Sequence, residues 1–375
     1  MLVVVDPSPD CDDPFSCFDS GESSDDDDQQ DDTCGDINDS APNANIVPDV
    51  ERGRRLVEAN NVRQISASTE HLPLHSSDYE VFDDRARGRG MGVRALRSFC
   101  AGDEIMREGA AMRVPRRLHA TNREEADTLF AGAVGDAFEA LSPATQDAAM
   151  SLSSCKEEDN GVDNSTKTPR GIYETTCYAL GDETDAGLFL TVSRMNHSCR
   201  PNANHIWRPD LQKTVIFAAR DIGVGDDICT SYGPSECLGT SGRRDYLRDR
   251  FAFECQCEMC MEGNDSGGDD RMIEFKSLNE DIAMYAATGQ PEIAIRTLDR
   301  CLALLDEQGI GTWPVVKSIL HYGYQISLTG LHDVVLARSY LARELLAVKS
   351  SEGVDCYKAV DIQNMLNDLD AEMKA

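Results

Sequence analysis

The stretch that decides the fold runs from Ser193 to Trp207 and reads SRMNHSCRPNANHIW. It sets Asn, His, Ser and Cys in four consecutive positions, then adds Pro-Asn and a second His. Three interpretations are open: a nucleophile with its base, half of a metal site, or a buried polar corner. A Cys199 nucleophile with His197 as base is disfavoured, because such pairs are normally distant in sequence. A buried corner would need many hydrogen-bond partners for its polar side chains.

The second informative stretch lies downstream and reads FECQCEMC, from Phe253 to Cys260. It contains three cysteines in a C-x-C-x2-C pattern, at Cys255, Cys257 and Cys260. Such tight spacing indicates zinc in preference to a chance cluster. Three thiolates do not complete a structural tetrahedral site, so a fourth ligand is required. The candidates are Cys199, Cys237 and a water molecule.

The third stretch lies upstream and reads RARGRGMGVRAL, residues 85–96. Its spaced glycines can let a cofactor approach the backbone, although for this stretch taken alone a Gly-rich hairpin turn is the favoured explanation. It is not a dinucleotide fingerprint, because the residues that follow are typical of a strand and not of a helix. The arginines are weak support for nucleic-acid binding in a chain this acidic.

Charge and composition separate the first fifty residues from the rest of the 375-residue chain. Residues 1–50 hold 15 acidic and no basic residues, and so contribute about half of the net charge of −31. We expect an acidic disordered tail there, with docking to a basic partner as the alternative. The opening MLVVVDPSPD does not resemble a signal peptide, and the chain lacks a run of 18 apolar residues. Its 14 cysteines therefore indicate thiols or metal in a reducing compartment.

The remaining pattern predicts an α+β chain. Short strands with glycine turns are expected from Tyr79, in YEVF, GVRALRS, EIMRE, TVIFAARDI and DDICTSYG. Within them, residues 118–152 have helical spacing, with Ser142 as an N-cap and Pro143 at the first helical position. The predicted regions are a linker at 51–76, a linker at 263–270 and an all-helical C-terminal region at 271–375. That region resembles tetratricopeptide hairpins without a clean 34-residue period, or a helical addition packed on the first domain.

Four motifs, in the order GRGMGVRA, RMNHSCRPN, ICTSYG and FECQCEMC, together resemble a SET-domain protein lysine methyltransferase. The resemblance covers roughly residues 77–262 and is greatest to the SET and MYND family and its fungal relatives. It implies a SET-type domain of short strands with a knot-like core, a helical insert at about 114–172, and a post-SET zinc segment. The helical C-terminal region is expected to pack against this domain and to wall one side of the substrate cleft.

The resemblance also implies residue roles. Gly90 and Met91 would contact S-adenosylmethionine through the backbone, and Asn196 and His197 would hold its amino-acid and adenosine parts. Phe253 would stack on the adenine. Tyr232 would be the catalytic tyrosine and would line the cofactor site beside the transferred methyl group. The implied zinc ligands are Cys199, Cys255, Cys257 and Cys260.

The implied activity is methyl transfer from S-adenosylmethionine to a lysine of a protein substrate, histone or otherwise. The expected protein is a monomer of the nucleus or cytoplasm, with no direct nucleic-acid partner and no membrane association. Two departures bear on this prediction. Only Cys155 occurs within residues 114–172, where the MYND finger would lie, and Thr176 replaces a cofactor-touching Asn of relatives. The alternatives are a catalytically weak or inactive SET scaffold that acts by protein binding, and a plain zinc-stabilised interaction domain.

Overall fold

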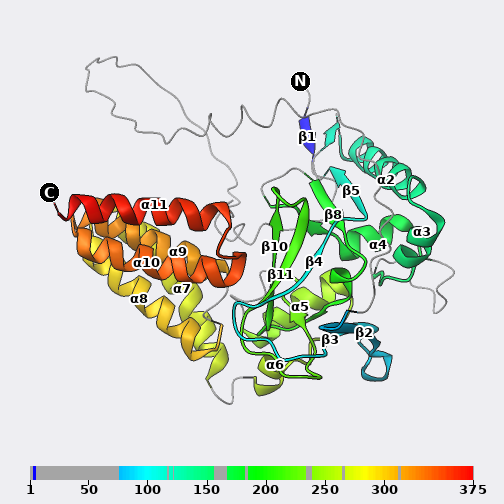
Figure 1. Ribbon diagram of the computed structural model, residues 1–375, viewed down its shortest axis with the longest axis horizontal. Coiled ribbons are helices and arrows are strands. Elements are labelled where there is room, and N and C mark those ends of the chain that lie inside the picture. The colour runs from blue at the N-terminus through cyan, green and yellow to red at the C-terminus, as the bar shows by residue number, and fades with distance from the viewer. Residues whose placement is uncertain are drawn as a thin grey trace, which may run out of the picture. The chain divides into compact units, whose positions relative to one another are not determined.

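The computed structural model describes residues 3–5, 76–115, 118–120, 122–155, 167–181, 185–233, 239–263, 267–310 and 314–374. Strands and a few helices alternate between residues 79 and 230, and the chain that follows, from Thr240 to Glu372, is mainly helical (Figure 1). The α+β class is therefore as predicted, with several small sheets in place of one large sheet.

A three-stranded sheet and a hairpin form the core of the strand-rich domain. The sheet has the antiparallel order β10 (Ala203–Arg208), β11 (Lys213–Ala218), β4 (Glu104–Glu108). The hairpin pairs β2 (Tyr79–Asp83) with β3 (Met91–Ala95) across the Gly-rich loop. Alternate side chains of these strands, such as Val93, Ile216 and Trp207, enter one apolar core, as the two-residue period of a strand requires.

Two short strands bring the motifs RMNHSCRPN and ICTSYG together. β9 (Asn196–His197) pairs in parallel with β12 (Cys229–Thr230), so that Asn196 lies opposite Cys229 and His197 opposite Thr230. Tyr232 comes two residues after β12 ends and lies beside His197. The knot-like threading implied by the resemblance stays a prediction.

The insert has its own apolar core, built on Phe130, Ile172, Tyr173 and Leu188. Ser142 accepts a hydrogen bond from the Thr145 N–H at 3.2 Å and caps the helix that starts at Pro143, as predicted. The elements of residues 112–188, which include the predicted insert, are β5 (Met112–Pro115), β6 (Leu118–Ala120), α2 (Arg123–Glu139), α3 (Pro143–Met150), α4 (Pro169–Thr176), β7 (Tyr178–Ala179) and β8 (Asp185–Leu188).

The C-terminal region is helical, as predicted, and its helices lie side by side (Figure 1). The first helix begins at Gly268, three residues inside the predicted linker. Gly289 has a φ of 72°, which only glycine adopts readily, and it separates the first two helices. The elements are α7 (Gly268–Ala287), α8 (Pro291–Glu307), α9 (Pro314–Gln325), the π-helix η7 (Ile326–Gly330), α10 (Val334–Glu352) and α11 (Tyr357–Glu372). A tetratricopeptide relationship remains a prediction.

Val3–Val5 forms β1, which pairs with β6, and this differs from the fully disordered tail that we expected. The three valines are β-branched and uncharged, unlike the acidic residues that follow, and can therefore pair as a strand. The other residues of the acidic tail and nearly all of the predicted 51–76 linker lie outside the described residues. Among the described helices, none is both long and apolar enough to cross a membrane.

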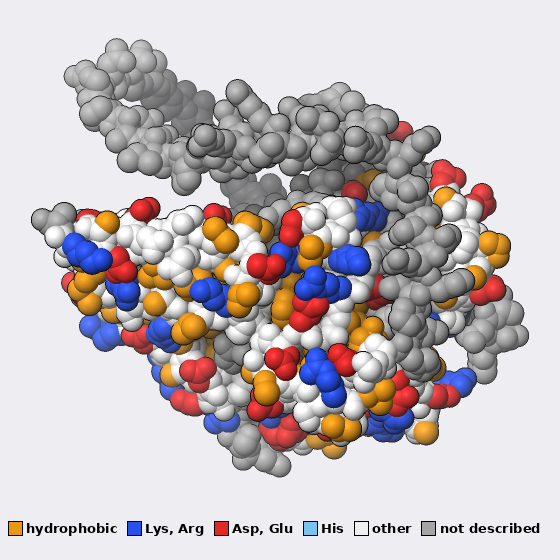
Figure 2. Space-filling model, viewed as in Figure 1, with side chains coloured by type: hydrophobic (Ala, Val, Ile, Leu, Met, Phe, Trp, Pro, Cys, Tyr) orange, Lys and Arg blue, Asp and Glu red, His pale blue; other side chains and the backbone are white. Residues whose placement is uncertain are grey.

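The helical region packs on the strand-rich domain through apolar and ionic contacts. One apolar cluster contains Cys199 and Leu247 together with Met272, Phe275 and Leu305 from the helical region. Arg208 of β10 donates to Asp355, between α10 and α11, at 3.0 Å. On the face shown in Figure 2, basic and acidic side chains are interspersed between apolar ones.

Candidate functional site

A cavity of about 1000 Å³ is lined by the residues that were predicted to bind the cofactor and to act in catalysis. Its wall includes Gly90, Met91, Asn196, His197, Tyr232 and Phe253. The described residues that line it fall between Arg87 and Cys257, so the helical region does not wall this cavity. The helices pack instead against the segment that carries the cysteines, and the expectation that they wall the substrate cleft stays a prediction.

Glycines shape the loop at one edge of the cavity. Gly90 has a φ of 70°, a conformation that other residues rarely adopt. A Cβ at Gly92 would lie 2.8 Å from the Phe82 ring and 3.0 Å from Nδ2 of Asn196, so only glycine allows this approach. The glycines of this stretch therefore let the backbone lie directly against the side chain of Asn196.

An ionic network holds the same loop against the strand that leads to Tyr232. The buried carboxylate of Asp84 pairs with Arg87 and lies 2.6 Å from Nε of Arg89. Asp227, just before β12, pairs with the same two arginines, at 3.1 Å for Arg87. These arginines are therefore held by carboxylates of their own chain, which explains them without nucleic acid.

Tyr232 is fixed by two hydrogen bonds that it donates to residues of the 193–207 stretch. Its hydroxyl donates to the carbonyl of Met195 at 2.8 Å, and its backbone N–H donates to Nδ1 of His197 at 3.1 Å. Burial raises the pKa of the Tyr232 hydroxyl well above its usual range, so it stays protonated and remains a donor.

His197 connects this tyrosine to the cysteines. Because Nδ1 accepts from Tyr232, the hydrogen-bond pattern assigns the proton to Nε2, which lies 3.2 Å from Sγ of Cys199. Burial lowers the pKa of His197 to about 4, so the ring is neutral at physiological pH. Both ring nitrogens are thus engaged within the protein.

Aromatic rings surround Tyr232, and one of them was missed from the sequence. Phe251 lies 5.0 Å from the Tyr232 ring and Phe253 lies 6.2 Å from it, measured between centroids. The helix α5 (Thr240–Phe251) ends with Ala252 at a φ of 55°, and this reversal lets both phenylalanines line the cavity. The F-x-F spacing was the available signal, but it is also typical of a strand.

Glu108 of β4 is a second residue that the sequence did not indicate. Its buried carboxylate accepts from the backbone N–H groups of Leu190, Thr191 and Val192 at 2.7–3.1 Å. Burial raises the pKa of this carboxyl, and the three N–H donors oppose that shift. Glu108 therefore holds the backbone of residues 190–192, immediately before the stretch that begins at Ser193.

Thr176 lines the cavity, but its hydroxyl donates to the carbonyl of Ile172 at 2.7 Å within α4. The Thr176 carbonyl accepts from the Ser193 hydroxyl at 2.8 Å. Thr176 is thus hydrogen-bonded to its own helix and to Ser193. Its side chain lacks the amide of the asparagine that it replaces.

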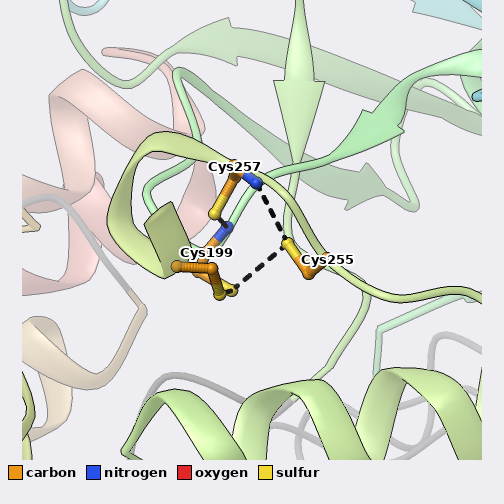
Figure 3. A group of neighbouring side chains, drawn as sticks. Cys199, Cys255 and Cys257 are labelled. Atoms are coloured by element: carbon orange, nitrogen blue, oxygen red, sulfur yellow. Dashed lines mark hydrogen bonds between the residues drawn. The ribbon is translucent and has the colours of Figure 1, made fainter. Parts of the chain in front are cut away.

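Four cysteine sulfurs converge beside the cavity, because those of Cys199, Cys255, Cys257 and Cys260 lie within 4.8 Å of one another. Figure 3 shows three of these side chains, Cys199, Cys255 and Cys257. Sγ of Cys199 is 4.0 Å from Cys255 and 3.6 Å from Cys260. A tetrahedral zinc with Zn–S bonds of about 2.3 Å separates its sulfurs by ~3.8 Å, so the donor set fits.

The surroundings of these cysteines also suit metal ligands. The guanidinium of Arg244 donates to the backbone carbonyls of Cys255 at 3.2 Å and Cys260 at 3.1 Å. The backbone N–H of Cys199 donates to Sγ of Cys257 at 3.4 Å, and such a bond favours the thiolate, which is the form that binds metal. Cys237, the rival fourth ligand, lies outside the described residues.

Comparison with known proteins agrees with this geometry. Residues 90–233 match the family model described as the SET domain. The histone-lysine N-methyltransferase set5 of Schizosaccharomyces pombe is 43% identical over 79 residues, 21% of this chain and 24% of that protein. The histone-lysine N-methyltransferase SMYD3 of Homo sapiens is 40% identical over 88 residues, 23% of this chain and 19% of that protein.

A third relative, the protein-lysine N-methyltransferase SMYD4 of Mus musculus, is 28% identical over 155 residues, 31% of this chain and 19% of that protein. In these three matches, the aligned segment spans about a quarter or less of the relative's length. The chain therefore contains a SET domain and is similar, within that part, to SET5 and SMYD methyltransferases.

Proposed function

We propose that this protein transfers a methyl group from S-adenosylmethionine to the side-chain amine of a lysine in a protein substrate. The observation that carries the proposal is the convergence of the Gly-rich loop, Asn196, His197, Tyr232 and Phe253 on one cavity of the SET domain. When bound, S-adenosylmethionine supplies an activated methyl group on a sulfonium, so the protein must chiefly align and desolvate the acceptor.

The target lysine must lose its charge before it can attack. Phe251, Phe253 and the ring of Tyr232 give the cavity an aromatic wall. Burial against such rings disfavours an ammonium relative to a neutral amine.

We assign Tyr232 to the acceptor end of the cavity. The two hydrogen bonds at its hydroxyl and backbone N–H hold the ring in one orientation. The Tyr232 oxygen and the Met195 carbonyl are acceptors that can stabilise polarised C–H groups, each weakly. Gly90, Met91, Asn196 and Phe253 would hold the cofactor, with His197 positioned between them and the cysteines.

We also propose that Cys199, Cys255, Cys257 and Cys260 bind one structural zinc ion. The sulfur distances support this donor set, and four thiolates leave no open position for catalysis. The ion would hold Phe253, two residues before Cys255, at the cavity wall.

The relatives' names indicate histones or other proteins as the substrate class, which would place the protein in the nucleus or cytoplasm. The test combines calorimetry with S-adenosylmethionine and a methyl-transfer assay on histones and a lysine-peptide array. Binding together with transfer to lysine is expected. Binding without transfer on any substrate would favour a scaffold, and absence of binding by metal-loaded protein would overturn the proposal.

A further inference from the structure

Arg243 of α5 is a buried cation to which the proposed function gives no role. The residue is 0% exposed. One helical turn later, Leu247 belongs to the apolar cluster that also contains three of the four cysteines. A guanidinium in such surroundings is costly unless other groups balance its charge. The groups that balance it therefore indicate what the residue does.

Asp269, in the first turn of α7, balances this charge only in part. Its Oδ1 lies 3.5 Å from a guanidinium nitrogen of Arg243, which is at the long limit of a hydrogen bond. The same oxygen accepts from the backbone N–H and from the hydroxyl of Thr240, each at 2.8 Å. The closer partners of this carboxylate atom are thus the two groups of Thr240.

Arg243 also donates a hydrogen bond to the sulfur of Cys260. Burial acts to lower the pKa of Arg243, but the bond to Cys260 and the charges of Cys199, Cys260 and Asp269 raise that pKa overall. The guanidinium therefore lies against the four cysteines and not only against Asp269.

Each of the four cysteine sulfurs accepts a hydrogen bond from an N–H group. Three of the donors are neutral and lie 3.2–3.5 Å from their sulfurs, and Figure 3 shows the last of the three. They are Nε2 of His197 to Cys199, the backbone N–H of Cys199 to Cys257, and the backbone N–H of Cys257 to Cys255. The fourth donor is Arg243, and it carries a full positive charge.

Two other arginines near the cysteines bind different groups. Arg244 donates to backbone carbonyls of the zinc segment. Arg200, directly after Cys199, pairs with Glu262 at 3.1 Å. Of these three arginines, Arg243 is therefore the one whose charge lies against a cysteine sulfur.

We propose that Arg243 is the cation that balances the charge of the metal centre, an inference that rests on the proposed zinc site. Zn²⁺ bound by four thiolates carries a net negative charge, which is costly to bury alone. A permanent cation beside Cys260 offsets this charge, and the thiolates in turn offset the buried guanidinium. Because Asp269 lies in α7, Arg243 also connects the metal centre to the first helix of the C-terminal region.

The test uses the full chain and measures Zn²⁺ affinity by competition with a chromophoric chelator. Loss of a partner beyond the ligands typically costs about 10–100-fold in metal affinity, so Arg243→Gln should bind Zn²⁺ about that much more weakly than wild type. Arg243→Lys keeps the charge and should lose less. The matched control is Arg248→Gln on the same helix, because Arg248 is exposed and pairs with Asp245. It should keep wild-type affinity.

A second measurement separates the charge of Arg243 from its packing. Co²⁺ can take the place of Zn²⁺ among four thiolates, and its sulfur-to-metal charge-transfer bands report on the sulfur electrons. A nearby cation stabilises those electrons, so the bands of Arg243→Gln should lie at lower energy than those of wild type and of Arg243→Lys. The bands come from the metal-bound fraction alone, so a less stable variant still gives an answer.

The outcomes distinguish this inference from the zinc site on which it rests. If wild type binds Zn²⁺ and Arg243→Gln binds it equally tightly with unshifted Co²⁺ bands, the charge-balancing role is wrong and the zinc site stands. If wild type binds neither metal, the zinc site and the inference fail together. Weaker binding with unshifted bands would assign Arg243 to packing and would also contradict the proposal.

Discussion

At the scale of single residues, the site depends on side chains whose polar atoms are already engaged. Tyr232, His197 and Cys199 form a continuous series, joined by hydrogen-bonding contacts of 3.1 and 3.2 Å. Glu108 fixes the backbone ahead of them. The local order of the signature stretch therefore comes from contacts between residues far apart in sequence.

Tyr232→Phe should lower kcat about 10-fold or more and leave S-adenosylmethionine affinity, metal content and fold nearly unchanged. It removes one hydroxyl, bonded to the Met195 carbonyl, from a packed ring. Loss in kcat without loss in binding is expected of an interaction made in the transition state. Steady-state kinetics with calorimetry measure both, and a variant with wild-type kcat would show that the tyrosine is misassigned.

Gly92→Ala should weaken S-adenosylmethionine binding about 10-fold or more, because the new Cβ would displace Asn196 or Phe82. The matched control is Gly132→Ala, in the interior of α2 with no atom within 4 Å of a Cβ. That control should keep binding and gain about 0.5–1 kcal/mol in unfolding free energy. Equal affinities of the two variants for S-adenosylmethionine would contradict the proposal that the Gly92 backbone must lie close to Asn196 for binding.

At the scale of elements, three short segments meet in one place. The parallel pairing of β9 with β12 sets Tyr232 beside His197. The short helix α6 (Glu258–Glu262) follows Cys257 and turns Cys260 back toward Cys199. The proposed metal ligands, cofactor residues and catalytic tyrosine therefore depend on the same three short segments.

Cys199→Ser should lower zinc content from one ion per chain and also weaken S-adenosylmethionine binding. Loss of the metal would release Cys255 and, with it, Phe253 at the cavity wall. Native mass spectrometry and calorimetry measure the two effects, with the exposed Cys100→Ser as control. Full zinc in Cys199→Ser together with loss in Cys237→Ser would make Cys237 the fourth ligand.

A pH-dependent contact joins α9 to α10. His321 Nδ1 lies 3.0 Å from Glu344, whose hydrogen bond raises the pKa of His321. Because the folded pKa is raised, the stabilisation is full below the unfolded value of about 6.5 and is lost as pH rises through the folded value. Urea unfolding of wild type and His321→Gln should differ more at pH 5.5 than at pH 8.5. The difference will be small, since the side chain is 38% exposed. A larger difference at pH 8.5 would contradict it.

At the scale of the whole molecule, the helical C-terminal region packs against the SET domain next to the four cysteines. Cys199, Cys255 and Cys260 share an apolar cluster with α7, α8 and α9. Arg208, 7% exposed, binds Asp210 through two nitrogens and Asp355 through a third. The helices therefore pack against the segment that carries the proposed zinc ligands, and they do not contribute to the lining of the cavity.

Arg208→Lys should lower the unfolding free energy by about 1 kcal/mol, because an ammonium cannot reproduce a three-point fork. Chemical unfolding measures this, and the Kd of S-adenosylmethionine should not change, since Arg208 does not line the cavity. Arg300 forms an exposed ion pair with Glu274 on α7, so Arg300→Lys should leave the unfolding free energy unchanged. A loss of cofactor affinity in Arg208→Lys would show that this contact also shapes the cavity.

The sequence by itself determined the features that depend on near neighbours. The C-x-C-x2-C segment, the Ser142 cap and the helices of 271–375 follow from short-range spacing and periodicity. The resemblance to SET-domain methyltransferases then selected the residues that meet at the cavity. Their roles remain predictions, as does the knot-like core.

Only the tertiary structure decided which distant residues complete the site. Glu108 lies 82 residues before the Leu190 N–H that it binds, and Asp227 lies 138 residues after Arg89. His205 looks like any strand residue until its face of β10 is seen to open on the cavity. Such contacts depend on strand register and on packing between segments, which the spacing of residues along the chain does not encode locally.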